Sequence, residues 1–266
     1  MAIAGSSGSG KSLLAHAVMG ILPENAKVTG KVIFKGETLD QKKKERLRGT
    51  EIALVPQSVA YLDPLMRVGK QVTGCDPKKE KQKSQKEIFK RFHLDEKIER
   101  YYPFQISGGM ARRVLVSTAV ISNTSLIIAD EPTPGLDLEM ALEALKIFRE
   151  LADEGKAVVL ITHDIDLAFH IADRIAVFYA GTTVEMAKAE DFRKGMEELR
   201  HPYSKALWQA LPQNGFRPIP GFQPYAKYLP KGCLFSPRCP YKTKECENNI
   251  PMREVRGGYV RCIHAT

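Results

Sequence analysis

A glycine-rich segment near residue 5 limits the possible folds of this chain more than any other part of the sequence. Its eight residues fit the phosphate-loop pattern G-x-x-x-x-G-K-[ST]. They are Gly5, Ser6, Ser7, Gly8, Ser9, Gly10, Lys11 and Ser12. An apolar stretch precedes them and a stretch of helical character follows to Leu22, an order that gathers backbone N–H groups around a phosphate. The segment therefore predicts an α/β protein that binds a nucleotide, with Lys11 reaching the β- and γ-phosphates and Ser12 ligating Mg²⁺.

A second motif supplies carboxylates for the same chemistry. The apolar run Leu126–Ala129 reads as a buried strand, and Asp130 and Glu131 follow it directly. In a nucleotide hydrolase, the first of two such acids holds the Mg²⁺ side of the site. The second, Glu131, is placed to orient or activate the attacking water. An apolar strand that ends in Asp-Glu is common by itself. In a chain that also contains a phosphate loop, it is specific for a nucleotide site.

Short apolar runs alternate with helical patterns along most of the chain, which indicates a parallel sheet with helices on both faces. The expected strands are 30–34, 52–55, 126–129, 157–161 and 174–179. The expected helices include 112–121, 138–151 and a segment that ends at Ile171. Residues 78–101 are charged with helical spacing, and residues 212–240 are rich in Pro, Gly and aromatic residues with little periodicity.

The chain has 266 residues and a formal net charge of +9, with basic groups at 42–48 and 78–91. These groups fit either solvated helix faces or a surface close to a membrane, and no zinc-finger or RNA-binding motif points to nucleic acid. No apolar run approaches the roughly 18 residues that cross a bilayer, and the first residues lack a secretory signal. We therefore expect a cytosolic protein whose membrane role comes through partners.

The segment Ile106-Ser107-Gly108-Gly109-Met110 resembles the signature motif of ABC-transporter ATPases. The family usually has Gln at the position of Met110. A Met at this position resembles the motif of one branch of the peptide and nickel importers. A serine and two glycines that open a helix form an anion site. The resemblance implies that Ser107, Gly108, Gly109 and Met110 act on the ATP bound by a partner subunit.

Three further family positions follow in order. Gln57 matches the glutamine that senses Mg²⁺ and water and couples to the membrane subunit. Asp137, in Pro134-Gly135-Leu136-Asp137, matches the D-loop that crosses the dimer interface. His163 matches the switch histidine that contacts the γ-phosphate. The resemblance thus implies catalytic roles for Glu131, His163 and Gln57, with Mg²⁺ held through Ser12, Gln57 and Asp130.

The C-terminal part narrows the branch. His201-Pro202-Tyr203-Ser204-Lys205-Ala206-Leu207 looks like the HPYTKAL segment of oligopeptide, dipeptide and nickel importer ATPases, and the segments 218–221 and 232–239 continue the likeness. The implied architecture is a RecA-like P-loop core at 1–57 and 123–200, a helical signature subdomain at 58–122, and an irregular Cys-rich appendage at 201–266. The likeness also favours the D-type member of a D/F heterodimer over a homodimer.

One departure concerns the start of the chain. Members of the family carry strands and an adenine-stacking aromatic residue ahead of the phosphate loop, whereas here four residues precede Gly5. Either a late start or a truncation accounts for this. We expect the chain to lack an edge of its sheet and to bind ATP weakly.

Four of the five cysteines, Cys233, Cys239, Cys246 and Cys262, crowd into the last 34 residues, while Cys75 stands apart. Disulfides are disfavoured in a reducing compartment. Four thiolates can hold a 4Fe–4S cluster, which relatives in this branch carry. A zinc site, with His264 as an alternative ligand, and free thiols in a small core remain alternatives.

Together these motifs predict an ATP-hydrolysing subunit of a bacterial-type ABC importer of peptides, nickel or a related solute. Its expected partners are a second ATPase subunit, two transmembrane permease subunits and, indirectly, an extracytoplasmic solute-binding protein. It is expected at the cytoplasmic face of the membrane. The alternatives are a non-transport ABC ATPase and a regulatory, non-catalytic subunit; the motif 106–110 disfavours a P-loop kinase.

Overall fold

The computed structural model describes residues 1–74, 79–122, 124–134 and 138–265. It divides into two compact units, one made of Met1–Lys11 and Leu160–Thr266, the other of Ser12–Val159. Cys75 and the D-loop residue Asp137 lie outside the described residues.

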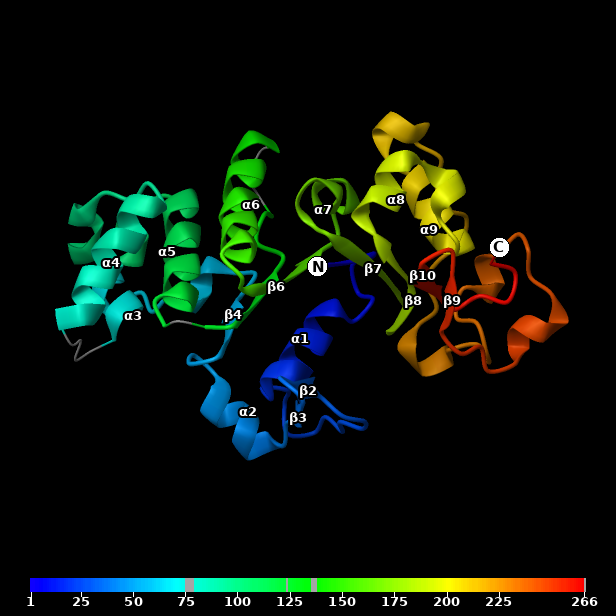
Figure 1. Ribbon diagram of the computed structural model, residues 1–266, viewed down its shortest axis with the longest axis horizontal. Coiled ribbons are helices and arrows are strands. Elements are labelled where there is room, and N and C mark those ends of the chain that lie inside the picture. The colour runs from blue at the N-terminus through cyan, green and yellow to red at the C-terminus, as the bar shows by residue number, and fades with distance from the viewer. Residues whose placement is uncertain (75–78, 123, 135–137, 266) are drawn as a thin grey trace. The chain divides into compact units, whose positions relative to one another are not determined.

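The first unit is built on strands β1 (Ala2–Ala4), β7 (Arg174–Tyr179), β8 (Thr182–Lys188), β9 (Arg253–Val255) and β10 (Gly258–Val260), together with the end of β6 (Ala157–Thr162) from Leu160 onward. The buried strand β1 pairs in parallel with the end of β6 on one side and with β7 on the other. β8 and then β10 and β9 continue the sheet in antiparallel pairings, and Figure 1 shows this last hairpin in red beside β8. The C-terminal region therefore adds strands to the sheet, which its irregular composition did not indicate.

The helices of the first unit are α7 (Ile165–Ile171), α8 (Ala189–Lys194) and α9 (Pro202–Gln209). α7 packs against β1 and α8, and α8 packs against β8. Short 3-10 turns connect the rest: η4 (Met196–Glu198), η5 (Pro212–Asn214), η6 (Ala226–Tyr228), η7 (Ser236–Arg238) and η8 (Lys244–Glu247). Pro residues begin or enter several of these turns, which limits regular structure after α9.

The second unit contains the parallel strands β4 (Ile52–Val55) and β5 (Leu126–Asp130) and a small hairpin, β2 (Ile33–Phe34) and β3 (Glu37–Thr38). Its helices are α1 (Lys11–Met19), α2 (Gln41–Leu47), α3 (Val68–Thr73), α4 (Lys79–Arg91), α5 (Gly108–Val120) and α6 (Leu138–Asp153), with 3-10 turns η1 (Val59–Tyr61), η2 (Glu96–Arg100) and η3 (Pro103–Gln105). α5 packs on β4 and α3, and Figure 1 shows α3, α4 and α5 gathered together in cyan and green. Buried Phe89, Phe92 and Val114 belong to the core of this unit.

The observed elements follow the predicted pattern closely where apolar runs are long. The strands predicted at 52–55 and 174–179 occur with the same bounds. The strand predicted at 30–34 is wrong in length, since only Ile33 and Phe34 pair, and Ile33 is exposed. The two basic groups form α2 and α4, and the lysines of α4 from Lys81 onward are exposed, as expected for solvated helix faces. No helix among the described residues is long and apolar enough to cross a membrane.

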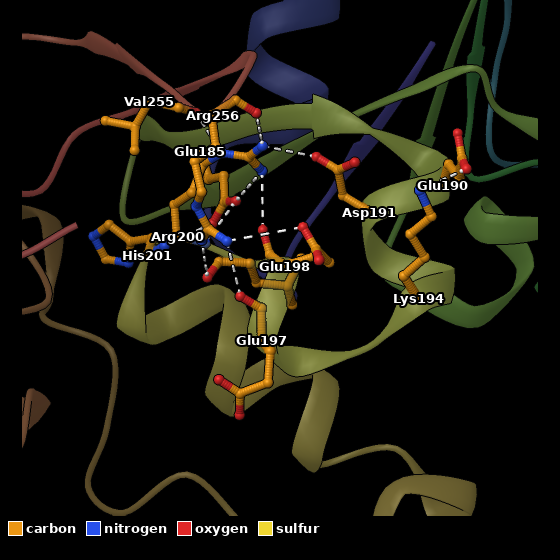
Figure 2. Close-up of polar contacts among 11 residues, drawn as sticks. Glu185, Glu190, Asp191, Lys194, Glu197, Glu198, Arg200, His201, Val255 and Arg256 are labelled. Atoms are coloured by element: carbon orange, nitrogen blue, oxygen red, sulfur yellow. Dashed lines mark hydrogen bonds and ion pairs between the residues drawn. The ribbon is translucent and has the colours of Figure 1, made fainter. Parts of the chain in front are cut away.

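A buried arginine ties the C-terminal hairpin to the rest of the first unit (Figure 2). Arg200 contacts Glu185 of β8 at 3.4 Å and Asp191 of α8 at 2.8 Å, with the Arg200 and Glu185 side chains almost fully buried. The same guanidinium donates to the carbonyls of Val255 and Arg256 at 2.7 and 2.6 Å. A charge taken out of water this completely needs several partners, and Arg200 has them on three elements.

Candidate functional site

Residues 5–11 of the phosphate loop lie in the first unit, directly after β1. Gly5 is required there because a Cβ atom would collide with the backbone carbonyl of Phe178. Gly10 is required for a different reason, since its φ of 98° lies in the left-handed region. The buried Lys11 ammonium donates to the carbonyl oxygens of Gly5 and Ser6 at 2.9 and 3.0 Å. The loop thus wraps around a cation, whose two carbonyl acceptors phosphate oxygens can replace.

The second unit contains a hydroxyl and a carboxylate suited to Mg²⁺. Ser12 donates from its Oγ to Oδ1 of Asp130 at 3.1 Å. Asp130 is the last residue of β5 and is buried, as are the three apolar residues before it. Hydroxyl, carboxylate and side-chain carbonyl oxygens are the ligand type that Mg²⁺ prefers. The residues present therefore fit the ion that the sequence motifs imply.

Gln57 and Glu131 come together at the carboxyl edge of the two strands of the second unit. The register of β4 with β5 places Val55 opposite Ala129, so both side chains follow neighbouring strand ends. Gln57 Nε2 donates to Glu131 Oε2 at 3.3 Å. Glu131 has a φ of 45°, a conformation that costs free energy in a non-glycine residue and is typical of functional sites.

Arg112 contributes to this arrangement although the sequence pattern placed it only in an apolar helix. It lies on α5, is buried, and donates from Nη1 to the carbonyl oxygen of Glu131 at 3.3 Å. Burial lowers the pKa of Arg112. An arginine on an otherwise apolar helix face, two residues after the signature motif, was the signal available in the sequence.

His163 lies in the first unit, directly after β6, and is exposed. The pairing of Ala4 with Thr162 brings the next residues, Gly5 and His163, to the same end of two parallel strands. The structure therefore places the predicted switch histidine at the strand edge from which the phosphate loop starts.

The signature segment opens α5 as predicted from its composition. Ser107 is the N-cap, and its Oγ accepts from the Met110 backbone N–H at 3.3 Å. Ser107 and Gly108 are exposed, and Gly109 and Met110 are half-buried. A helix of thirteen residues with an accessible, small-residue N-terminus is suited to an anion presented from outside.

The four C-terminal cysteines are free thiols, with Cys239 half-buried and the others buried. Among the residues that the structure describes, no group of three or more His, Cys, Asp and Glu side chains is arranged to hold a metal ion. Burial raises the pKa of Cys233 and Cys262. The expected iron–sulfur cluster and its zinc alternative are therefore not supported.

Burial raises the pKa of Cys233, and so does the proximity of the other three thiols; two of the thiols also have other contacts. Cys246 Sγ lies 3.5 Å from Nε2 of His264. Cys262 packs with Val260 and Ala265 in a small apolar cluster. The crowding of four cysteines into the last 34 residues, together with the family resemblance, predicted a ligand set, but among the described residues no metal-binding group forms.

Family models match two parts of the chain. One described as "ABC transporter" matches residues 1–134. One described as "Oligopeptide/dipeptide transporter, C-terminal region" matches residues 184–246.

Relatives match over nearly the full length. The oligopeptide transport ATP-binding protein OppD of Salmonella typhimurium is 35% identical over 98% of this chain and 82% of its own. The dipeptide transport ATP-binding protein DppD of Bacillus subtilis is 34% identical over 96% of this chain and 81% of its own.

Solved structures agree with the fold. The dimeric post-hydrolysis structure of the ATP-binding cassette MJ0796 bound to ADP and Pi is 28% identical, with a TM-score of 0.62 over 71% of this chain and 84% of that chain. CbiO1 of Clostridium perfringens, part of the transporter complex cbiONQ, is 25% identical with the same TM-score over 73% of this chain and 81% of that chain.

Proposed function

Because the chain belongs to the ABC transporter ATP-binding family, whose members couple ATP hydrolysis to transport, we propose that it drives a bacterial-type importer of peptides. The cargo class rests on relatives named for oligopeptide and dipeptide transport and on the matching C-terminal region. The nickel cargo that the motifs also left open has no support in these relatives.

The phosphate loop and the acidic strand end act on one ATP in this proposal. Lys11 exchanges the carbonyls of Gly5 and Ser6 for phosphate oxygens. The oxygens of Ser12, Asp130 and Gln57 hold Mg²⁺, which neutralises charge on the phosphates when bound.

Glu131 orients the attacking water, and Gln57 holds the Glu131 carboxylate in place. His163 contacts the γ-phosphate. In-line attack on the γ-phosphate needs mainly positioning and electrostatic stabilisation, which these side chains supply.

The signature segment serves a second subunit. Ser107, Gly108, Gly109 and Met110 present an open helix N-terminus to the ATP of the partner, and Asp137 crosses between the two subunits. The partner is a second ATPase subunit, with this chain as the D-type member of the pair. Two permease subunits and, through them, a solute-binding protein complete the assembly at the cytoplasmic face of the membrane.

The observation that carries the proposal is the Ser12–Asp130 contact beside the Gln57–Glu131 contact, at the carboxyl ends of β4 and β5. Lys11→Ala tests it. We expect loss of ATP binding by titration calorimetry and loss of ATP-driven peptide uptake by the reconstituted transporter. Lys90→Ala, an exposed lysine of α4, is the matched control. ATP binding that survives Lys11→Ala would refute the proposed site.

A further inference from the structure

The C-terminal region contacts the phosphate loop within the first unit, more than 200 residues away along the chain. Ser6 Oγ donates to Gln223 Oε1 at 2.9 Å, and Gln223 Nε2 donates to the carbonyl oxygen of Gly8 at 3.4 Å. A second side chain, the buried Tyr203 of α9, also faces Ser6. Burial raises the pKa of Tyr203, and hydrogen bonding from the Ser6 side chain and backbone partly offsets this rise.

These contacts meet the loop at the residue on which its own hydrogen bonds converge. The Ser6 carbonyl accepts from Lys11 Nζ at 3.0 Å and from the Ser9 N–H at 3.3 Å. Gln223 and Tyr203 therefore restrain the residue that orients the Lys11 ammonium. A restraint on Ser6 is passed to Lys11 through a single peptide unit.

Gln223 contacts the Ser6 hydroxyl and the Gly8 carbonyl oxygen. A phosphate bound by the loop needs neither of these two groups. A phosphate is bound by N–H groups and the lysine. Gln223 can therefore stay in place when a nucleotide binds, and its contacts order the loop rather than block it. Ordering a loop before binding reduces the entropy lost on binding.

Gln223 itself is held by a well-fixed segment. Pro224 restricts Gln223 to extended backbone. Arg238 holds the two residues before Gly221, because it donates to the carbonyls of Ile219 and Pro220 at 2.9 and 2.7 Å. The Arg238 guanidinium also lies over the ring of Phe235, which is fully buried. The chain is thus anchored at Pro220, three residues before Gln223.

We propose that Gln223 is a positioning residue of the ATP site, which acts through Ser6 and Gly8 to hold the phosphate loop ready for the triphosphate. This inference rests on the proposed function, because it assumes that the loop binds ATP. It makes the C-terminal region part of the nucleotide site of its own chain.

The test compares the full chain with Gln223→Met, which keeps the side-chain length and removes both hydrogen bonds. We expect the Kd for ATP and the KM for ATP to rise about fivefold, with kcat changed by less than about twofold and the thermal midpoint unchanged. The matched control is Gln213→Met, since the Gln213 side chain bonds to Asp166 instead of the loop.

A double-mutant cycle shows whether Gln223 acts through Ser6. Ser6→Ala should raise the Kd by a similar factor, and the combined variant should raise it by less than the product of the two single effects, because the two changes share the Ser6–Gln223 contact. Additive effects would contradict action through Ser6.

Two results would overturn the proposal. An unchanged Kd with a lowered thermal midpoint would show a purely structural contact, and a lowered Kd would show that Gln223 hinders nucleotide binding. Lys11→Ala separates this inference from the proposed function. Loss of ATP binding in Lys11→Ala with no effect of Gln223→Met removes the inference alone, whereas ATP binding retained in Lys11→Ala removes the proposed function.

Discussion

The amide of Gln57 donates to the carboxylate of Glu131 at 3.3 Å, across the ends of two parallel strands. Glu131 has a left-handed backbone, a conformation that costs free energy in a non-glycine residue and is typical of functional sites. Arg112 adds a bond to the Glu131 carbonyl. A carboxylate held by the Gln57 amide, on a backbone held by Arg112, is suited to orient a water molecule for in-line attack.

Glu131→Gln should separate hydrolysis from binding. The amide keeps the size of the side chain but cannot accept a proton or align water as a carboxylate does, so turnover should fall at least about 100-fold. ATP affinity should stay within about twofold, measured by calorimetry beside a phosphate-release assay. Turnover near that of the unchanged protein, in the assembled complex, would remove Glu131 from this role.

Ser107→Ala should impair the ATP site of the partner subunit. The change removes the cap on the Met110 N–H and a hydroxyl from an open helix N-terminus. In a crosslinked heterodimer, we expect hydrolysis to fall at the site completed by the altered signature and ATP binding to this chain's own loop to persist. Unchanged hydrolysis at the partner's site would contradict a shared site.

Arg200→Met should destabilise the first unit strongly. It leaves the fully buried Glu185 carboxylate without its ion-pair partner, a change that costs about 3–5 kcal/mol in comparable cases. Denaturant titration should show a lower midpoint with little change in the control Lys194→Met, which breaks the exposed pair with Glu190 in Figure 2. Similar midpoints for the two variants would mean that Arg200 does not hold the hairpin in place.

His201 should make the protein less stable in acid. Burial lowers the pKa of His201 to about 3, from about 6.5 in the unfolded chain. Between these values the unfolded state binds more protons, so the free energy of unfolding rises with pH; this stability is complete above pH 6.5 and is lost as pH falls toward 3. Between pH 7.5 and 5 the loss is roughly 2 kcal/mol.

His201→Asn provides the comparison for that measurement. Asparagine preserves an acceptor for the Tyr203 backbone N–H, which the His201 ring now caps at 3.0 Å, and it does not titrate. Urea unfolding of both proteins at pH 5 and 7.5 should show a smaller pH dependence in the variant. Equal pH dependence would mean that His201 is protonated in the folded protein.

The residue types predicted the α/β class of fold, and the residues of the predicted nucleotide site were named from motifs and from the family resemblance. An apolar strand such as Ile52–Val55 must be covered on both faces. At Gly5 and Gly10, only glycine fits the space and the backbone conformation. The residue types themselves therefore indicate these local requirements. The family resemblance implied separate roles for Gln57 and Glu131, and their contact depends on the parallel pairing of β4 with β5. Each of these features depends on neighbours a few residues away or on one strand pairing.

The contacts of the C-terminal region, in contrast, became known only from the tertiary structure. Gln223 and Arg200 carry no motif, because their partners lie on segments brought close by folding rather than by spacing. The four cysteines show the converse, since their crowding and the family resemblance predicted a metal group, whereas the described residues form contacts such as that of Cys246 with His264 and no metal-binding group. Long-range contacts of this kind depend on the summed geometry of many elements, and periodicity and motif spacing record only the local part of it.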